Sequence, residues 1–253
     1  MRNDEGNTTP KMRGCSMIQF LWFDLGYTLV KMNREEVYQK VLGEFDVYRS
    51  QEEIALAYHR TDKLFMREYQ GVLGKDSRAF LPWYVGALNY KLRLSLPIEE
   101  VVHVYRKLAS EYPLQWTAFD GAKETLFELK NLGYRLGLIS NWDQTARVVL
   151  EKNGLDEVLD EVFISSEVGL EKPDPAIFRL ALEQAKVTSN QSLYIGDNYY
   201  DDVIGCQKVG MHCLLINPYG NCGVEELSYQ PVIRGIQDVS TYLGHPQQRL
   251  EVN

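Results

Sequence analysis

One apolar run near the amino terminus ends on a carboxylate, and it limits what the chain can fold into. Residues 18–23 are mostly apolar, as expected for a strand of a parallel sheet that is covered on both faces. Asp24 follows the run, and Gly26 then lets the backbone turn sharply. In open α/β sheets, ligands bind at the carboxyl ends of the strands. The run therefore predicts an α/β fold with a polar site beside Asp24.

The remainder of the chain divides into two regions with different periodicity. Between residues 33 and 112, four apolar stripes keep the spacing of amphipathic helices, and glycine and proline residues separate them. From Trp116 onward, short apolar runs alternate with helical patterns. The strands expected there are 135–139, 162–165, 193–195 and 213–216. This alternation predicts a parallel sheet with right-handed crossovers, interrupted after its first strand by an all-helical bundle.

Composition and charge narrow the class of partners. The 253 residues include 35 acidic and 27 basic side chains, and the net charge of -8 argues against binding nucleic acid or an anionic membrane. No segment approaches the roughly 20 apolar residues of a membrane span. The four cysteines form no CxxC pair, and residues 1–16 lack the apolar segment of a signal peptide. We therefore expect a cytoplasmic protein with a disordered leader over residues 1–16.

Polar side chains stand at or near the ends of several predicted strands. They are Asp24, Ser140, Asn141, Lys172, Asp197, Asp201 and Asp202. In a parallel sheet these ends share one edge, so residues distant in sequence can meet there. Crowded carboxylates repel one another unless cations lie between them. Lys172 can serve as one such cation, and a hard, oxygen-binding ion such as Mg²⁺ can serve as another. A carboxylate held in this way stays ionised and can act as a nucleophile, and Asp24 is the candidate.

Four segments, in this order, resemble the motifs of the haloacid dehalogenase-like (HAD) hydrolase superfamily. They are FDLGYTL from residue 23, LISNWD from residue 138, EKPDPAIF from residue 171 and IGDNYYDDVIGCQKVGM from residue 195. The resemblance covers nearly the whole chain from Met17 and is greatest to the REG-2-like branch. It implies a Rossmann-like parallel sheet core of residues 17–30 and 114–253, with an inserted helical cap over residues 31–113.

The resemblance also implies a role for each polar residue. Asp24 becomes the nucleophile, and Lys172 becomes the cation between nucleophile and phosphate. Ser140 and Asn141 become the phosphate-binding residues. The implied Mg²⁺ ligands are Asp24, Gly26 through its carbonyl, Asp197 and Asp202. The implied reaction is Mg²⁺-dependent hydrolysis of a small phosphorylated metabolite through an aspartyl-phosphate intermediate.

Gly26 is the position at which the chain departs from the family pattern. Most phosphatases of this family have a second Asp there, which protonates the leaving oxygen and then activates water. Loss of a general acid and base typically slows a reaction by about 10² to 10⁴. We therefore expect a phosphatase whose activity on unactivated esters is reduced.

Three other functions stay open. A 2-haloacid dehalogenase-type hydrolase releases a halide that needs no proton, although known enzymes of that type have Tyr at the Gly26 position. A catalytically feeble protein that binds a phosphorylated ligand or a protein partner is the second alternative. A reaction of the phosphonoacetaldehyde hydrolase type would need a lysine of the cap as Schiff base. Its candidates are Lys40, Lys63, Lys75 and Lys91.

Overall fold

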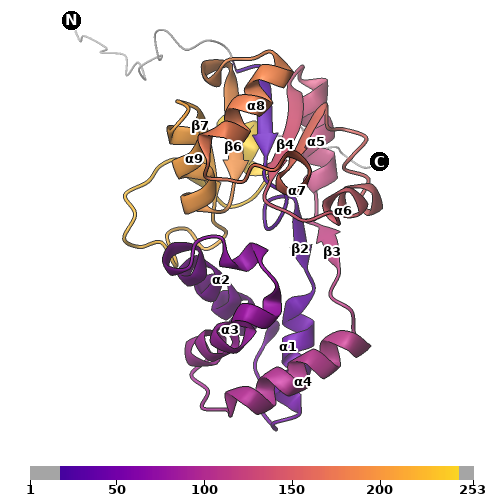
Figure 1. Cartoon of the computed structure of the whole chain (residues 1–253), viewed down its shortest axis with the longest axis vertical. Helices are drawn as coiled ribbons and strands as arrows, with labels where there is room; N and C mark the ends of the chain where they lie inside the picture. Colours follow the sequence, from indigo (N-terminus) through magenta and orange to yellow (C-terminus); the bar gives the residue numbers. More distant parts are fainter. Residues whose placement is uncertain (1–17, 245–253) are drawn as a thin grey trace, which may run out of the picture.

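Six parallel strands form the central sheet of the structure, a computed structural model that describes residues 18–244 (Figure 1). Their order is β5 (Glu161–Ile164), β4 (Arg135–Ser140), β1 (Phe20–Phe23), β6 (Ser192–Gly196), β7 (His212–Ile216) and β8 (Val232–Ile233). The predicted parallel sheet is therefore confirmed. The predicted last strand, 213–216, is followed by β8, whose two residues are too few to show a pattern. The leader predicted over residues 1–16 lies outside the described residues.

Side chains of β1 alternate between two apolar layers. Leu21 and Phe23 belong to one layer, Phe20 and Trp22 belong to the other, and all four are fully buried. The first layer includes α5 (Ala122–Asn131), α6 (Ala146–Lys152) and α10 (Asp238–Tyr242). The second includes α8 (Pro175–Ala185) and α9 (Ile204–Gln207). Burial on both faces explains why the run that opens the fold is apolar without alternation.

Four helices form a separate helical lobe beyond the carboxyl ends of the sheet strands (Figure 1). They are α1 (Arg34–Gly43), α2 (Gln51–Glu68), α3 (Ser77–Lys91) and α4 (Ile98–Glu111). The lobe has its own apolar core, to which residues such as Val41, Ile54 and Val101 contribute. The helical insertion after the first strand is confirmed, whereas its bounds at residues 31 and 113 stay predictions.

Two short antiparallel strands carry the chain between the lobes. β2 (Val30–Met32) enters the helical lobe and β3 (Trp116–Ala118) leaves it, and the two strands pair in register from Val30 with Ala118 to Met32 with Trp116. Neither was expected from the sequence, because three residues are too few to show an alternating pattern. Within residues 18–244, no helix combines the length and the apolar character needed to cross a membrane.

Candidate active site

The carboxyl edge of the sheet gathers the predicted carboxylates. Asp24 follows β1 in the middle of the sheet, and Asp197 follows the neighbouring β6. Together with Asp202, each offers an oxygen that lies within 4.8 Å of the other two. All three side chains are buried, and Asp202 is fully so. The topology of the sheet, with β1 between β4 and β6, is what brings these distant residues together.

Lys172 is buried among these carboxylates and donates to two of them. Its Nζ lies 2.8 Å from Asp24 Oδ1, 2.7 Å from Asp202 Oδ1 and 2.8 Å from the hydroxyl of Tyr194. Three acceptors satisfy all three protons of an ammonium group. Burial alone would lower the pKa of Lys172, but the carboxylates of Asp202 and Asp24 outweigh it and raise that pKa. Lys172 is therefore a permanent cation that bridges Asp24 and Asp202.

Tyr194 is a member of this cluster that was not predicted from the sequence. Its hydroxyl accepts from Lys172 and donates to the carbonyl of Ile139 at 2.7 Å. In the sequence it stands inside an apolar strand, where an aromatic residue is ordinary. The available signal was a hydroxyl between two aliphatic residues in a fully buried strand, which requires a polar partner.

Asn141 holds the loop that carries Lys172. Its Oδ1 accepts the backbone N–H of Lys172 at 2.7 Å, and its Nδ2 donates to the backbone carbonyl of Lys172 at 2.8 Å. The side chain of Asn141 is thus occupied in positioning the lysine. Ser140, at the end of β4, is buried and lines the same cavity as Asp24. Phosphate binding by Ser140 and by the backbone of Asn141 stays a prediction.

Asp202 belongs to a wide helical turn, η3 (Tyr199–Val203), that precedes α9. Asn198 caps this turn, because its side chain accepts the backbone N–H groups of Tyr200 and Asp201. Asp202 Oδ2 accepts the backbone N–H of Asn198 at 3.0 Å. A Cβ at Gly196 would stand only 2.1 Å from that same Oδ2, so only glycine permits this approach. Burial raises the pKa of Asp202, and the charge of Lys172 opposes that rise.

Asp201 lies beside this cluster without joining its ionic contacts. Its Oδ2 accepts from Asn198 Nδ2 at 2.7 Å, and burial raises its pKa to about 6. Asp201 is thus bonded to Asn198, the residue that caps the turn.

A lysine from the helical lobe also reaches the site. Lys63 of α2 is buried, and its Nζ donates to Asp197 Oδ2 at 3.0 Å and to the backbone carbonyl of Asp197. Burial raises the pKa of Asp197, and the charge of Lys63 works against that rise. The sequence offered four lysines of the insertion without distinguishing them. Lys63 is the one that contacts a predicted metal ligand.

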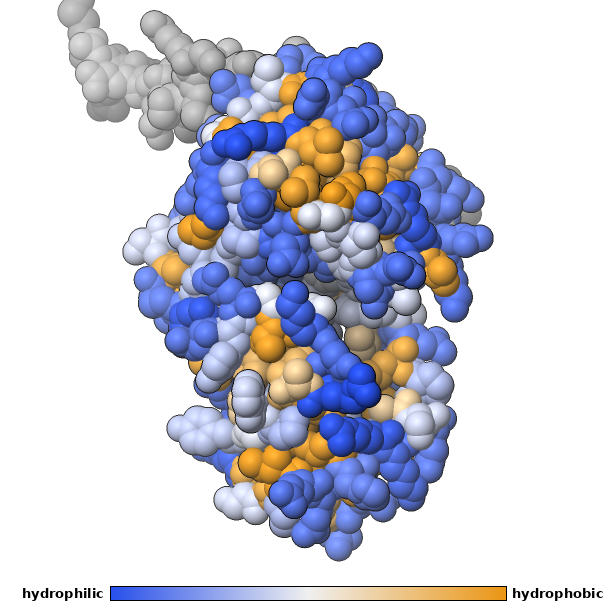
Figure 2. Space-filling view, in the orientation of Figure 1, coloured by the Kyte–Doolittle hydropathy of each residue, from blue (hydrophilic) through white to orange (hydrophobic). Residues whose placement is uncertain are grey.

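Between the two lobes lies a cavity of about 1530 Å³, which Figure 2 shows as a hollow in the middle of the molecule. Its sheet side includes Asp24, Gly26 and Asp197. Its helical side is largely aromatic and apolar. Lining residues on that side include Tyr38, Tyr58, Tyr69, Phe80, Leu81, Tyr84, Val85 and Tyr105.

One ion pair stands within this aromatic wall. The guanidinium of Arg34 lies 4.3 Å from the ring centre of Tyr27 and 4.2 Å from that of Tyr58. It pairs with Asp62, and it also donates to the hydroxyl of Tyr84 at 3.2 Å. Burial alone would lower the pKa of Arg34, but Asp62 outweighs it and raises that pKa. Arg34 is therefore a fixed cation on the wall that faces the sheet.

The space beside Gly26 is filled by indole rings. A Cβ on Gly26 would lie 3.2 Å from Cζ3 of Trp142 and 3.7 Å from Cη2 of Trp116. The two indoles pack edge to face, with ring centres 4.7 Å apart. The position where most family phosphatases have their general acid is thus bordered by apolar rings.

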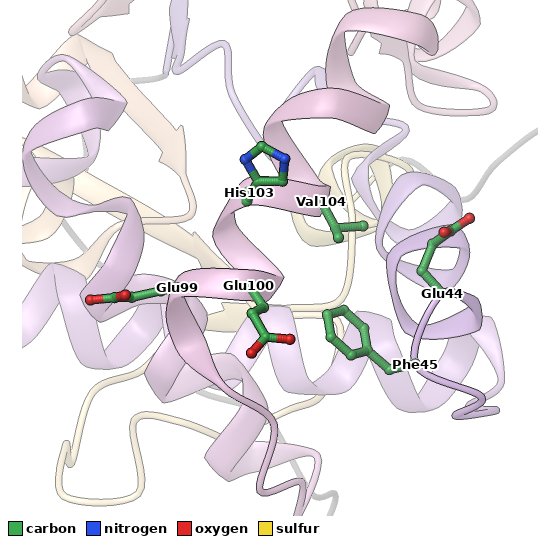
Figure 3. A pocket seen from close by; sticks show the side chains of 6 residues that line it. All are labelled: Glu44, Phe45, Glu99, Glu100, His103 and Val104. Carbon is green, nitrogen blue, oxygen red and sulfur yellow. The ribbon is translucent and has the colours of Figure 1, made fainter.

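Another hollow, on the helical lobe, differs in chemistry (Figure 3). It lies beside α4 and is lined by Glu44, Phe45, Glu99, Glu100, His103 and Val104. Three carboxylates there would repel a phosphorylated ligand. The cavity between the lobes is accordingly the candidate active site.

The donor set of the carboxylate cluster fits a magnesium ion. Carboxylate oxygens are the ligands that this hard cation prefers. Within residues 18–244, Asp197 Oδ1 accepts no hydrogen bond, so this carboxylate has an oxygen to offer, and Asp24 Oδ1 keeps a lone pair beside the one that accepts from Lys172. Gly26, whose carbonyl is another predicted ligand, lines the same cavity.

Known proteins resemble this chain in sequence and in fold. The family model described as haloacid dehalogenase-like hydrolase matches residues 21–216. Haloacid dehalogenase-like hydrolase domain-containing protein 3 of Xenopus laevis is 33% identical over 167 residues, which cover 64% of this chain and 66% of that protein. A glyceraldehyde 3-phosphate phosphatase of Methanothermobacter thermautotrophicus is 36% identical over 105 residues, which cover 39% of this chain and 44% of that protein. The matches thus span no more than 66% of these two curated relatives.

The fold comparison agrees with the sequence match. A Bacillus subtilis HAD-hydrolase bound to magnesium superposes with a TM-score of 0.59 at 18% identity, covering 90% of this chain and 99% of that one. At such low identity the likeness concerns the fold, which is a parallel sheet with a helical insertion after its first strand. Because the family model spans most of the residues and the architecture agrees with it, the chain belongs to the haloacid dehalogenase-like hydrolase family.

Proposed function

We propose that this chain is a Mg²⁺-dependent phosphatase that acts on a small phosphorylated metabolite through an aspartyl-phosphate on Asp24. The observation that carries the proposal is the position of Lys172, whose ammonium bonds Asp24 and Asp202 at the edge of a cavity. The cation lies against Oδ1 of Asp24, and within residues 18–244 Oδ2 of Asp24 accepts no hydrogen bond and is free to attack. A glyceraldehyde 3-phosphate phosphatase among the relatives supports a small phosphorylated substrate.

In the first step, Asp24 Oδ2 forms a bond to phosphorus while the bond from phosphorus to the leaving oxygen breaks. Lys172 stabilises the charge that gathers beside Asp24. In the second step, water attacks the phosphorus, which frees inorganic phosphate and restores the carboxylate of Asp24. Asp24, Asp197 and Asp202 would hold Mg²⁺, with the carbonyl of Gly26 as a further ligand. When bound, the ion would neutralise the oxygens of the phosphoryl group.

The surroundings of Gly26 favour substrates whose leaving group departs without a proton. The indoles of Trp142 and Trp116 border that position and carry no group able to protonate an alkoxide. Acyl phosphates and aryl phosphates release weakly basic anions, so they react without such a group. We therefore expect faster turnover of these esters and anhydrides than of alkyl phosphates. The chain's composition supports a cytoplasmic location for this activity.

The test is phosphate release from acetyl phosphate and p-nitrophenyl phosphate, with and without Mg²⁺. Wild-type protein should release phosphate only with the metal, and Asp24→Asn should lower kcat at least 10³-fold, since it removes the nucleophile. Asp156→Asn makes the same chemical change at an exposed loop residue and should retain wild-type rates. Halide release from a 2-haloacid without phosphate release would favour the dehalogenase alternative. Absence of both activities, with a phosphorylated ligand bound, would favour the binding protein.

A further inference from the structure

We infer that Lys63 and a divalent cation compete for Asp197, so that contact between the lobes and metal binding oppose each other. The inference rests on the proposed metal site. It goes beyond that site because it assigns a function to a residue of the helical lobe. Lys63 would act as an internal counter-ion that neutralises Asp197 when no metal is bound.

The contact between Lys63 and Asp197 is short and largely buried. The Nζ atom approaches both the carboxylate and the backbone carbonyl of Asp197, and both side chains are buried. A metal ion on the free oxygen of Asp197 would stand within a few ångströms of the ammonium group. Two cations at that separation repel strongly in a buried site. Binding of a metal ion to Asp197 therefore weakens the contact of the Lys63 ammonium with Asp197. In the same way, the ammonium lowers the affinity of Asp197 for the metal ion.

A loop of the sheet lobe, residues 219–226, keeps Lys63 in place. His59 Nε2, one helical turn before Lys63, donates to the carbonyl of Cys222 at 2.9 Å. Arg67, one turn after it, pairs with Glu226 at 3.0 Å. Gly223 has a positive φ of 82°, and a Cβ there would stand 3.0 Å from Cβ of Lys63. The packing of α2 against residues 219–226 thus places the ammonium of Lys63 beside Asp197. Loss of the contact between Lys63 and Asp197 therefore weakens the contact between the lobes.

The competition is measured directly by titrating the full-length protein with Mn²⁺ in a calorimeter, without substrate. Lys63→Met and Lys63→Gln both remove the charge, and the glutamine amide can still donate to Asp197. Each should lower the Kd for Mn²⁺ at least tenfold. Lys40→Met, at an exposed lysine of α1, serves as control and should match the wild type.

The possible outcomes separate this inference from the proposed function. Mn²⁺ binding with the same Kd in wild type and both Lys63 variants would overturn the competition and leave the metal site intact. Absence of Mn²⁺ binding in all variants would overturn both.

Because coupling between two sites is reciprocal, saturating Mn²⁺ should also speed hydrogen–deuterium exchange in residues 219–226 of the wild type at least twofold. Unchanged exchange in metal-saturated protein would refute the predicted link to the contact between the lobes.

Discussion

Restoring a carboxylate at Gly26 tests whether this residue limits the chemistry. Gly26→Asp places a general acid and base at the position where most phosphatases of the family have one. Such a group is worth about 10² to 10⁴ in rate, or about 3 to 5 kcal/mol of barrier, for substrates whose leaving group must be protonated. p-Nitrophenolate leaves without a proton, so its release should change far less.

The substitution Gly26→Asp also creates a close contact, which opposes the gain in rate. The new Cβ would stand 3.2 Å from Cζ3 of Trp142, closer than ordinary van der Waals contact. Trp142 is half-buried and lies in a loop, so its ring can move by the few tenths of an ångström required. Overpacking of this kind typically costs about 1 to 3 kcal/mol. Trp142→Leu should relieve the contact, so the double variant should exceed the single variant in activity on alkyl phosphates.

The assay compares kcat/KM for an alkyl phosphate and for p-nitrophenyl phosphate in wild type, both single variants and the double variant. We expect Gly26→Asp to raise the alkyl-to-aryl ratio at least tenfold, and the double variant to raise it further. Trp142→Leu alone controls for a wider cavity and should leave the ratio near that of the wild type. An unchanged ratio in a folded double variant that still turns over the aryl substrate would refute the reasoning.

Two further predictions concern stability. Burial lowers the pKa of His59 from 6.5 to about 4, so between these values the unfolded chain binds more protons than the folded protein. Folding stability should therefore fall as the pH drops from 6.5 toward 4, by up to about 3 kcal/mol. His59→Gln should remove this part of the pH dependence in urea unfolding, and parallel profiles for the two proteins would contradict it. Gly196→Ala should lower both the urea midpoint and the phosphatase activity, because its Cβ would displace Asp202; a midpoint equal to that of the wild type would count against this.

The residues at the edge of the sheet could be predicted from the sequence, because the order and direction of the strands determine which residues meet there. Each predicted carboxylate follows a recognisable strand, and the parallel order places these strand ends together whatever the details of packing. Lys172 is less secure on that basis, since it stands on a loop whose backbone is held by the side chain of Asn141. Its place near a strand end made it a candidate cation, and the motif resemblance added its role between nucleophile and phosphate. The sheet lobe and most of its polar cluster could therefore be predicted from the sequence.

The contribution of the helical lobe could not be predicted in the same way. The helical stripe on α2 shows which side chains are apolar, but the choice among the lysines depends on how the whole lobe docks. That docking is determined by contacts such as the one between His59 and the carbonyl of Cys222, 163 residues apart in the sequence. Helical periodicity describes one element, whereas a contact between lobes depends on two.

The wall of indole rings beside Gly26 could not be predicted from the sequence either, because it also depends on contacts between distant elements. Trp116 is the first residue of β3, the strand by which the chain returns from the helical lobe. Its ring packs against Trp142 and stands edge-on to Tyr27, with ring centres 5.5 Å apart. A residue that borders Gly26 therefore belongs to the connection between the lobes. Because Trp116 of β3 pairs with Met32 of β2, the wall beside Gly26 and the connection between the lobes depend on the same pair of strands.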